Sequence, residues 1–296
     1  MSEQNWTVRS LLEWSTTFLT EREIDSPRLT AELLLADVLK TNRIGLYVRF
    51  DQPMDTPELA AFRGHLQRRS RKEPTQYILG TQDFWSLTFK VDSRVLIPRP
   101  ETECIIEEVQ RLVRARSLAG DGEFLDLCTG SGAIACALAA EFPFSDIHAS
   151  DISKEALALA KENAEDNGLE QQISFFQGSL FEALPEVQYD LIATNPPYIR
   201  HEEMETLQEE VRLFEPHLAL DGGKAGMDLI EQILHDAHRY LKPGGVLLME
   251  IGSSQGQEAL EAVKKAPELE EARLLQDYAQ LDRILCCRRT SSLPSV

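Results

Sequence analysis

Apolar residues in the first quarter of the chain recur at helical spacing. From residue 6 to 75 no strand-like alternation interrupts them. Two helix starts are indicated, one at Ser26-Pro27 and one at Asp55, because Ser and Asp cap helices and Pro fits a first helical turn. The pattern predicts a small helical domain over residues 1–75.

The pattern changes to alternation between Pro74 and Val95, where aromatic residues are frequent. The stretch YILGTQDFWSLTFKVDSRVLI predicts two strands that flank a turn at Gly80 to Asp83. We expect this β-hairpin, residues 76–97, to link two domains.

Strand and helix patterns alternate after Pro100. The expected strands are FLDLC, DIHASD, ISFFQG, DLIATN and VLLMEIG, and the expected helices are Gly132 to Glu141, Lys154 to Asn167, Met227 to Tyr240 and Gln255 to Lys265. Such alternation is typical of an α/β fold with a parallel, doubly wound sheet. The last two strands, ARLLQDY and RILCCRR, have no helix between them, so the last strand is expected to be antiparallel. Residues 98–296 are predicted to form this domain.

Composition limits the class of protein. Hydrophobic residues make up 43% and charged residues 27%, so a folded globular chain is expected. Apolar stretches such as Ala133 to Ala140 are far shorter than the roughly 18 residues of a membrane span, and no signal-peptide core is present. The five cysteines include no CxxC pair and no zinc-type spacing with histidine. We expect a cytoplasmic protein with buried reduced thiols, no membrane association and no metal.

The acidic excess is confined to the larger domain. The formal net charge is −19, yet residues 1–75 contain 11 basic and 11 acidic residues. Nucleic-acid binding normally requires a basic face that displaces counterions from phosphates. The charge therefore favours a protein or small-molecule substrate, and no direct contact with nucleic acid is expected.

A glycine-containing turn, Thr129 to Gly132, follows the first predicted strand and leads into an alanine-rich helix. Glycines let a ligand lie against the main chain, beside a helix N-terminus that has free N–H groups. A tight strand-helix connection alone would use the same residues. The turn therefore predicts a ligand site only in combination with further signals.

The second predicted strand ends at Asp151, 21 residues after Gly130. A carboxylate at this place can accept hydrogen bonds from both hydroxyls of a ribose, although Asp151 or Ser153 could also cap the next helix. Together with the turn it indicates an adenosine-bearing ligand. Cysteine stands at the first glycine of the dinucleotide fingerprint, which disfavours NAD and favours S-adenosylmethionine.

The fourth predicted strand ends in Asn195-Pro196-Pro197-Tyr198. Two consecutive prolines fix φ near −65° and remove two N–H donors, so the loop is stiff and presents carbonyl acceptors. Asn195 Oδ1 and the Pro196 carbonyl can each accept a hydrogen of a target NH₂ group, and Tyr198 can stack on a planar target. A simple strand-ending turn is the alternative. We predict a methyltransferase in which Asn195, Pro196 and Tyr198 are catalytic and Asn195 to Tyr198 bind the substrate.

Four segments of the chain are informative together: VLIPRPETE at 95–103, DLCTGSGAIA at 126–135, ASD at 149–151 and NPPYI at 195–199. In combination they resemble the HemK/PrmC family of release-factor glutamine methyltransferases. The resemblance covers nearly the full length. It implies a class I S-adenosylmethionine-dependent, Rossmann-like fold with a helical N-terminal domain. The implied activity is methylation of the glutamine side chain in the GGQ loop of peptide chain release factors, in translation termination.

The resemblance also implies residue roles. S-adenosylmethionine, which leaves as S-adenosylhomocysteine, would be bound by Cys128, Thr129, Gly130, Ser131, Gly132, Asp151, Ser179, Leu180 and Asn195. Arg99, Glu101 and Thr102 would line the mouth of the site, and RLFEPHLAL at 212–220 would cover it. The chain departs from the family at Cys128, where glycine is usual, and at Ser179, where relatives often have an acidic residue near the adenine. A slightly displaced first turn and the loss of one adenine contact are the expected consequences.

Within the family the N-terminal domain is thought to hold the release factor. Basic residues at the end of a predicted helix could contribute, namely Arg68, Arg69, Arg71 and Lys72, although such residues usually face water. Three alternative functions remain at this point. They are a glutamine methyltransferase of a ribosomal protein, an amino-methyltransferase of nucleic acid, and a cofactor-binding protein without catalysis.

Overall fold

The computed structural model describes residues 6–291, and the chain divides into two compact units. The first unit comprises Met1–Gly80 with Gln208–Phe214, and the second comprises Thr81–Leu207 with Glu215–Val296. The ends of the expected domains, residues 1–5 and 292–296, lie outside the described residues. The hairpin expected to be a separate linker groups with the second unit, and residues 208–214 group with the first.

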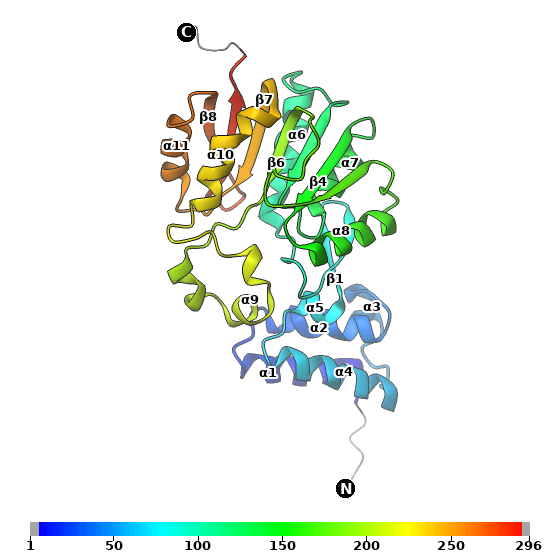
Figure 1. Ribbon diagram of the computed structural model, residues 1–296. Helices are drawn as coiled ribbons and strands as arrows, with labels where there is room; N and C mark the ends of the chain where they lie inside the picture. The colour runs from blue at the N-terminus through cyan, green and yellow to red at the C-terminus, as the bar shows by residue number, and fades with distance from the viewer. Residues whose placement is uncertain (1–5, 292–296) are drawn as a thin grey trace. The chain divides into compact units, whose positions relative to one another are not determined.

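The first unit is helical (Figure 1). Its helices are α1 (Val8–Thr20), α2 (Pro27–Val38), α3 (Arg43–Val48), α4 (Thr56–Arg69), α5 (Thr75–Leu79) and α9 (Glu209–Phe214). The start predicted at Asp55 is a capping box, in which Asp55 accepts the Glu58 N–H at 2.7 Å and Glu58 accepts the Asp55 N–H at 2.8 Å. Ser26 precedes α2 but makes no side-chain cap bond.

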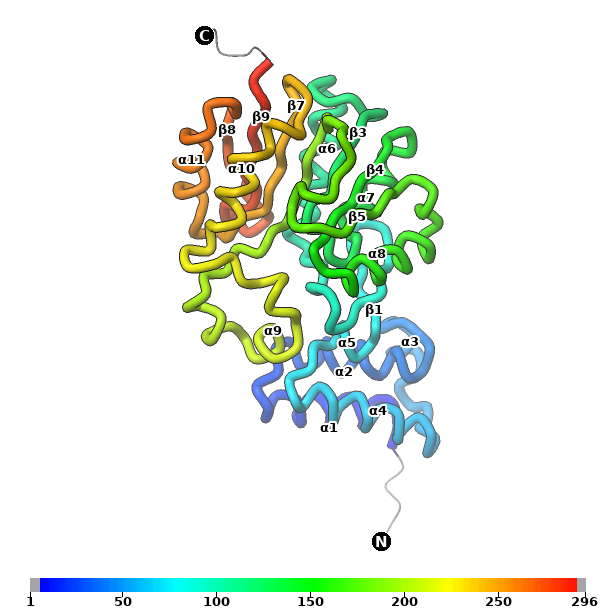
Figure 2. Tube along the Cα trace, in the orientation of Figure 1, coloured from blue at the N-terminus to red at the C-terminus, as the bar shows by residue number. Residues whose placement is uncertain are grey.

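Helix α9 comes from far along the chain and belongs to this first unit (Figure 2). Glu210 in α9 forms an ion pair at 2.5 Å with Arg69, whose side chain is only 4% exposed. Gln208, just before α9, donates to Asp25 at 3.4 Å. No periodic pattern in the sequence indicated this helix, because six residues are too few to show one.

The predicted hairpin is present, but its turn was placed wrongly. The strands are β1 (Thr81–Phe84) and β2 (Leu87–Lys90), so the turn lies at Trp85 and Ser86 rather than at Gly80 to Asp83. Gly80 instead ends α5, with φ of +77°. Trp85 adopts φ of +56° in the turn, where its backbone N–H donates to Glu103 and its indole N–H to Glu141. These two bonds stabilise the positive φ of Trp85, which the sequence did not predict.

The second unit is built on a seven-stranded sheet with the order β5-β4-β3-β6-β7-β9-β8. Its strands are β3 (Glu123–Leu127), β4 (Asp146–Asp151), β5 (Ile173–Gln177), β6 (Tyr189–Thr194), β7 (Leu241–Glu250), β8 (Leu269–Gln276) and β9 (Asp282–Arg289). Strands β3 to β7 are parallel, whereas β9 lies antiparallel between β7 and β8. The predicted α/β class, the doubly wound sheet and the antiparallel last strand are confirmed.

Helices cover both faces of this sheet (Figure 1). One core packs under α6 (Glu103–Arg114), α7 (Ala133–Glu141) and α8 (Lys154–Asp166), and the other under α10 (Asp228–Tyr240) and α11 (Gly256–Lys264). Cys286 and Cys287, adjacent on β9, point into the first and the second core respectively, as alternation along a strand requires. Short 3₁₀ helices at Pro100–Thr102, His201–Thr206 and His217–Ala219 complete the unit.

Candidate active site

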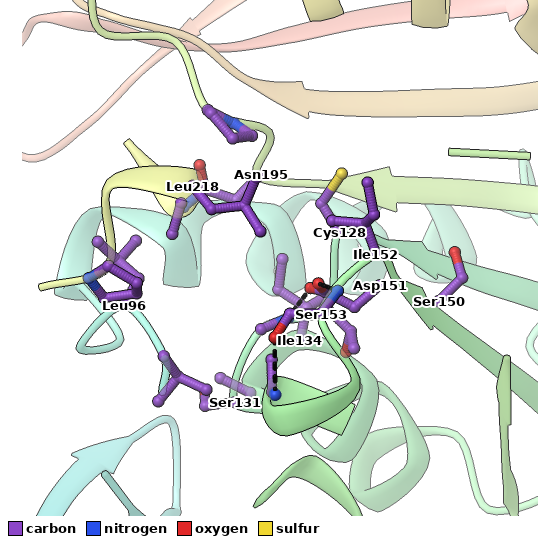
Figure 3. A pocket seen from close by; sticks show the side chains of 18 of the residues that line it. Leu96, Cys128, Ser131, Ile134, Ser150, Asp151, Ile152, Ser153, Asn195 and Leu218 are labelled. Carbon is purple, nitrogen blue, oxygen red and sulfur yellow. Dashed lines mark hydrogen bonds between the residues drawn. The ribbon is translucent and has the colours of Figure 1, made fainter. Parts of the chain in front are cut away.

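A pocket of the second unit lies where β3, β4 and β6 end, which is the edge at which open α/β sheets bind ligands (Figure 3). Nine residues predicted as site residues line it: Cys128, Thr129, Gly130, Ser131, Asp151, Ser179, Leu180, Asn195 and Pro197. Their segments are separated in sequence by up to 69 positions, and the parallel strands bring them together. Three others, Gly132, Pro196 and Tyr198, do not line the pocket.

The turn after β3 has left-handed backbone at alternate residues. The φ angles of Cys128, Gly130 and Gly132 are +63°, +54° and +82°. A Cβ on Gly130 would meet no atom within 4 Å, so this position leaves room for a ligand against the main chain. A Cβ on Gly132 would lie 3.1 Å from Ala160 Cβ, so this glycine serves the packing of α7 against α8. Cys128 adopts the conformation that glycine favours, and its side chain packs against the second core.

Asp126 anchors this turn from inside the fold. Its Oδ2 accepts the Thr129 hydroxyl at 2.5 Å and the Ala135 N–H at 2.9 Å, whereas its Oδ1 has no partner among the described residues. Burial raises the pKa of Asp126 to about 7. Asp126, on a strand whose other buried residues are apolar, thus fixes the turn to the strand and to the start of α7.

Asp151 connects the turn to the next helix. Its Oδ2 accepts the Gly130 N–H at 2.9 Å. Its Oδ1 accepts the N–H of Ser153 at 2.8 Å, and Ser153 lies next to it in Figure 3. The cap of α8 is Ser153, whose Oγ accepts the Ala156 N–H at 3.1 Å. Burial raises the pKa of Asp151, although the backbone donors oppose this shift. Each carboxylate oxygen keeps a lone pair, and the residue lines the pocket.

The loop after β6 is held at both of its ends. Asn195 Nδ2 donates to Thr102 Oγ1 at 3.3 Å, and the Tyr198 hydroxyl donates to Glu250 at 3.1 Å. The Tyr198 carbonyl also accepts from Gln255 Nε2 at 2.9 Å. Tyr198 is therefore directed toward Glu250 rather than into the pocket, and a stacking role for its ring is not visible in this arrangement.

The opposite side of the pocket is closed by residues 95–99 and by residues 215–219, the covering segment. Leu96 and Leu218 lie on this side, across from Asp151 (Figure 3). Arg99 binds Glu215 at 2.5 Å, and Glu215 also accepts the Ile97 N–H at 3.2 Å. These bonds tie the residues around 97–99 to those around 215–219. Arg99 and Thr102 line the pocket as expected, whereas Glu101 is exposed and does not.

Several lining residues were not predicted from the sequence. Ile152 lines the pocket although its side chain is 51% exposed, and Ile134 and Ser153 line it as well. Ile152 could have been predicted from the sequence, because it is an apolar residue directly after Asp151 at the end of β4. Glu250, a charged residue that ends the apolar strand β7, was the available signal for the buried contacts below the loop.

The basic residues at the end of α4 differ in their exposure and in the bonds that they make within the first unit. Arg69 is buried and paired with Glu210, and Arg68 binds Glu73 at 2.6 Å, so both are engaged within the first unit. Lys72 donates to two backbone carbonyls, those of Arg22 and Glu23. Arg71 is exposed. Surface contact with a partner protein therefore has to rely on residues other than Arg69.

Two other kinds of site are absent from the part of the chain that the structure describes. In the stretch from residue 6 to residue 291, no helix has both the length and the apolar character needed to cross a membrane. Over that same stretch, no cluster of three or more His, Cys, Asp or Glu side chains is arranged to hold a metal ion.

Comparison with protein families and sequences gives consistent matches. The PrmC N-terminal domain family matches residues 10–80, and the methyltransferase small domain family matches residues 109–224. A release factor glutamine methyltransferase of Geobacter sulfurreducens is 46% identical over 86% of this chain and 87% of its own. One from Chlorobaculum tepidum is 39% identical over 96% and 98%.

Comparison with solved structures supports the fold of the larger unit. The hMettl16 catalytic domain, in complex with MAT2A 3'UTR hairpin 6, aligns with a TM-score of 0.57 over 78% of this chain and 84% of its own, at 15% identity. A methyltransferase from Pyrococcus furiosus aligns with a TM-score of 0.51 over 70% and 91%, at 18% identity. At such low identity these likenesses concern the fold alone.

Proposed function

The chain belongs to the release factor glutamine methyltransferase family, and on this premise we propose that it transfers a methyl group from S-adenosylmethionine to the glutamine side-chain nitrogen in the GGQ loop of peptide chain release factors. One observation supports the proposal most directly. The turn with Gly130, the carboxylate of Asp151 and the amide of Asn195 line one pocket. Because the release factor is its substrate, we place the enzyme in the cytoplasm.

The pocket fits S-adenosylmethionine in its donors, acceptors and open backbone. Asp151 would accept the ribose hydroxyls, Gly130 would admit the ligand against the main chain, and Ile152 and Leu180 would pack against the adenine. Ser179, Cys128, Thr129 and Ser131 would complete the wall. When bound, this cofactor supplies a methyl group on a positively charged sulfur, which needs no metal for its activation.

Asn195 and the proline pair would hold the target. A glutamine amide nitrogen is a poor nucleophile because its lone pair is delocalised into the carbonyl group. Asn195 Oδ1 and the Pro196 carbonyl would accept its two hydrogens, which aligns the nitrogen and increases its electron density. Pro196 is buried and does not line the pocket, so its carbonyl rather than its ring is the group we assign to the substrate.

The first unit would hold the release factor. Its match to the PrmC N-terminal domain family supports this role, as does its balance of acidic and basic residues, in contrast to the acidic second unit. The formal charge of −19 disfavours nucleic acid as the substrate, and a ribosomal-protein substrate is the closer alternative.

The test is transfer of a labelled methyl group from S-adenosylmethionine to purified release factor. We expect labelling of the intact GGQ protein and none when its glutamine is replaced by alanine. N195A should lose labelling by roughly 100-fold or more, since it removes an acceptor that acts in the transition state. D151N should instead weaken cofactor binding, because its amide donates where Gly130 and Ser153 already donate.

Asp146→Asn is the matched control, since Asp146 is an exposed aspartate on the same strand as Asp151. It should bind cofactor and label the release factor like the wild type. Labelling of a ribosomal protein or of nucleic acid, with none on the release factor, would contradict the proposed substrate and leave the methyltransferase chemistry in place.

A further inference from the structure

A buried glutamate lies beneath the catalytic loop. Glu250 ends β7 and is 1% exposed. Its Oε2 accepts the Thr102 hydroxyl at 2.5 Å and its Oε1 accepts the Tyr198 hydroxyl at 3.1 Å. Both oxygens are thus bonded by hydroxyl groups, one from the 3₁₀ turn before α6 and one from the loop after β6. Nothing in the transfer reaction itself requires an acid at this place.

The Thr102 hydroxyl has a defined hydrogen-bond direction as a result. A hydroxyl has a single hydrogen, and Thr102 gives it to Glu250, so only lone pairs remain on Oγ1. Asn195 Nδ2 donates to that oxygen at 3.3 Å. If the Asn195 amide turned over, its Oδ1 would face an oxygen that has no hydrogen left to share. The arrangement therefore favours one of the two amide orientations.

Ionised Glu250 is required for this direction, because a protonated glutamate could donate to Thr102 and release the threonine hydrogen toward Asn195. Burial raises the pKa of Glu250, while the hydroxyls of Thr102 and Tyr198 and the positive charge of Arg283 oppose that shift. Arg283 lies on β9, next to the end of β7, and is itself paired with Asp277 at 3.1 Å. The negative charge of exposed Glu101 raises the pKa of Glu250 further.

We propose that Glu250 and Thr102 are positioning residues that hold the Asn195 side chain with Oδ1 toward the target amide and Nδ2 away from it. This inference rests on the proposed function, because it assigns Asn195 the part of an acceptor. The Tyr198–Glu250 bond fixes the other end of the same loop to the same carboxylate. The buried carboxylate of Glu250 thus sets the geometry of both ends of the loop after β6. Because Asn195 presents its oxygen to the target, the site binds N–H donors in preference to hydrogen-bond acceptors.

Thr102→Val and Thr102→Ser form a matched test. Valine keeps the shape of threonine but leaves Asn195 free to turn over, so kcat should fall roughly 10- to 100-fold, the effect of losing one oriented hydrogen bond. The cofactor dissociation constant should change less than about 3-fold, since that is within the usual effect of a site that makes no direct bond to it. Serine restores the hydroxyl and should restore kcat.

Glu250→Gln should also lower kcat, because a glutamine amide can donate to Thr102 and reverse the direction of the chain of bonds. Thr88→Val is the control for the loss of a threonine hydroxyl, since Thr88 is exposed on β2 and its hydroxyl bonds Asp83 within the hairpin. It should leave kcat unchanged. A T102V enzyme with wild-type kcat, or a T102S enzyme as slow as T102V, would overturn the proposal.

A second readout does not depend on turnover. In ¹⁵N-labelled protein, the Asn195 side-chain NH₂ signals can be assigned by their disappearance in N195A. We expect them to move in T102V and to return in T102S, and unchanged signals in T102V would overturn the positioning role. If the wild type labels no release factor but these shifts occur, the substrate assignment fails while the positioning of Asn195 stands.

Discussion

At the scale of single residues, the site depends on acidic groups that the fold keeps away from water. Asp126, Asp151 and Glu250 each end or nearly end a parallel strand, and burial raises the pKa of all three. Backbone N–H groups and hydroxyls offset part of the cost of burying them. These residues hold in place the turn after β3, the expected ribose site and the loop that we propose to be catalytic. Burying them lowers the stability of the fold but fixes the geometry of the site.

Buried Asp126 makes the protein less stable as pH rises. The pKa of Asp126 is about 7 in the folded protein and 3.8 for an ordinary aspartate, so the folded state binds the proton more tightly. Its ionisation therefore costs no stability at very low pH, costs more as pH rises from about 4 to 7, and reaches its full cost above 7.

Asp126→Asn removes this titration and tests it. At about 1.4 kcal/mol per pKa unit, the variant should gain roughly 2 to 3 kcal/mol relative to the wild type between pH 5 and pH 8. Urea unfolding at the two pH values measures the change. The exposed Asp121→Asn serves as control and should show no such gain. An equal stability difference at both pH values would contradict the assignment to Asp126.

At the scale of elements, the turn between β3 and α7 combines two glycines with different duties. Gly130→Ala should cost about 1 kcal/mol for its positive φ and should also weaken cofactor binding, because the new methyl group enters the pocket. Gly132→Ala should cost more, about 2 to 3 kcal/mol, since its Cβ also crowds Ala160.

Gly168→Ala is the matched control for these variants. Gly168 has φ of +70° and open space where an added methyl group would lie, but it is outside the pocket. Thermal unfolding should show a loss similar to that of G130A, while calorimetry should show unchanged cofactor binding. If G130A bound cofactor as well as G168A does, Gly130 would have no role in admitting the ligand.

How far the sequence predicts these elements depends on the length of each pattern. Helices α7, α8, α10 and α11 were predicted to within one residue at every end, because each is nine residues or longer and amphipathic or apolar throughout. The hairpin turn was misplaced because a glycine that ends α5 resembles a glycine in a turn. The 3₁₀ helices and α9 are too short to show a periodic pattern of apolar residues in the sequence.

The candidate site shows the same division. Strand ends marked by short motifs, such as Gly130, Asp151 and Asn195, could be predicted and do line one pocket. Tyr198 could not be placed, because its direction is set by a bond to Glu250 from a strand 52 residues away. Long-range hydrogen bonds between buried polar groups leave no local pattern, so the positioning residues are visible only in the fold.

At the scale of the whole molecule, the chain passes from the second unit into the first and back within a few residues. Residues 208–214 belong to the first unit, while Pro216, Leu218 and Ala219, directly after them, line the pocket of the second. The ion pair of Arg69 and Glu210 holds residues 208–214 within the first unit. The two side chains are 4% and 24% exposed. Chain continuity thus links the unit that we expect to hold the substrate to the covering segment.

Glu210→Gln tests this link, because it leaves Arg69 buried with a weaker partner and should destabilise the first unit by about 2 kcal/mol. If the anchoring of α9 supports the covering segment, the cofactor dissociation constant should also rise, by roughly 2- to 30-fold, the range of measured couplings between distant sites. Asp51→Asn is the control. It breaks the exposed pair with Arg9 and should change stability by less than about 0.5 kcal/mol, with no change in cofactor binding.

Calorimetric titration with S-adenosylhomocysteine measures the cofactor dissociation constant, and thermal unfolding measures the stability. An E210Q protein with a destabilised first unit and wild-type affinity would mean that bonds within the second unit, such as those of Glu215 with Arg99 and Ile97, hold the covering segment without α9.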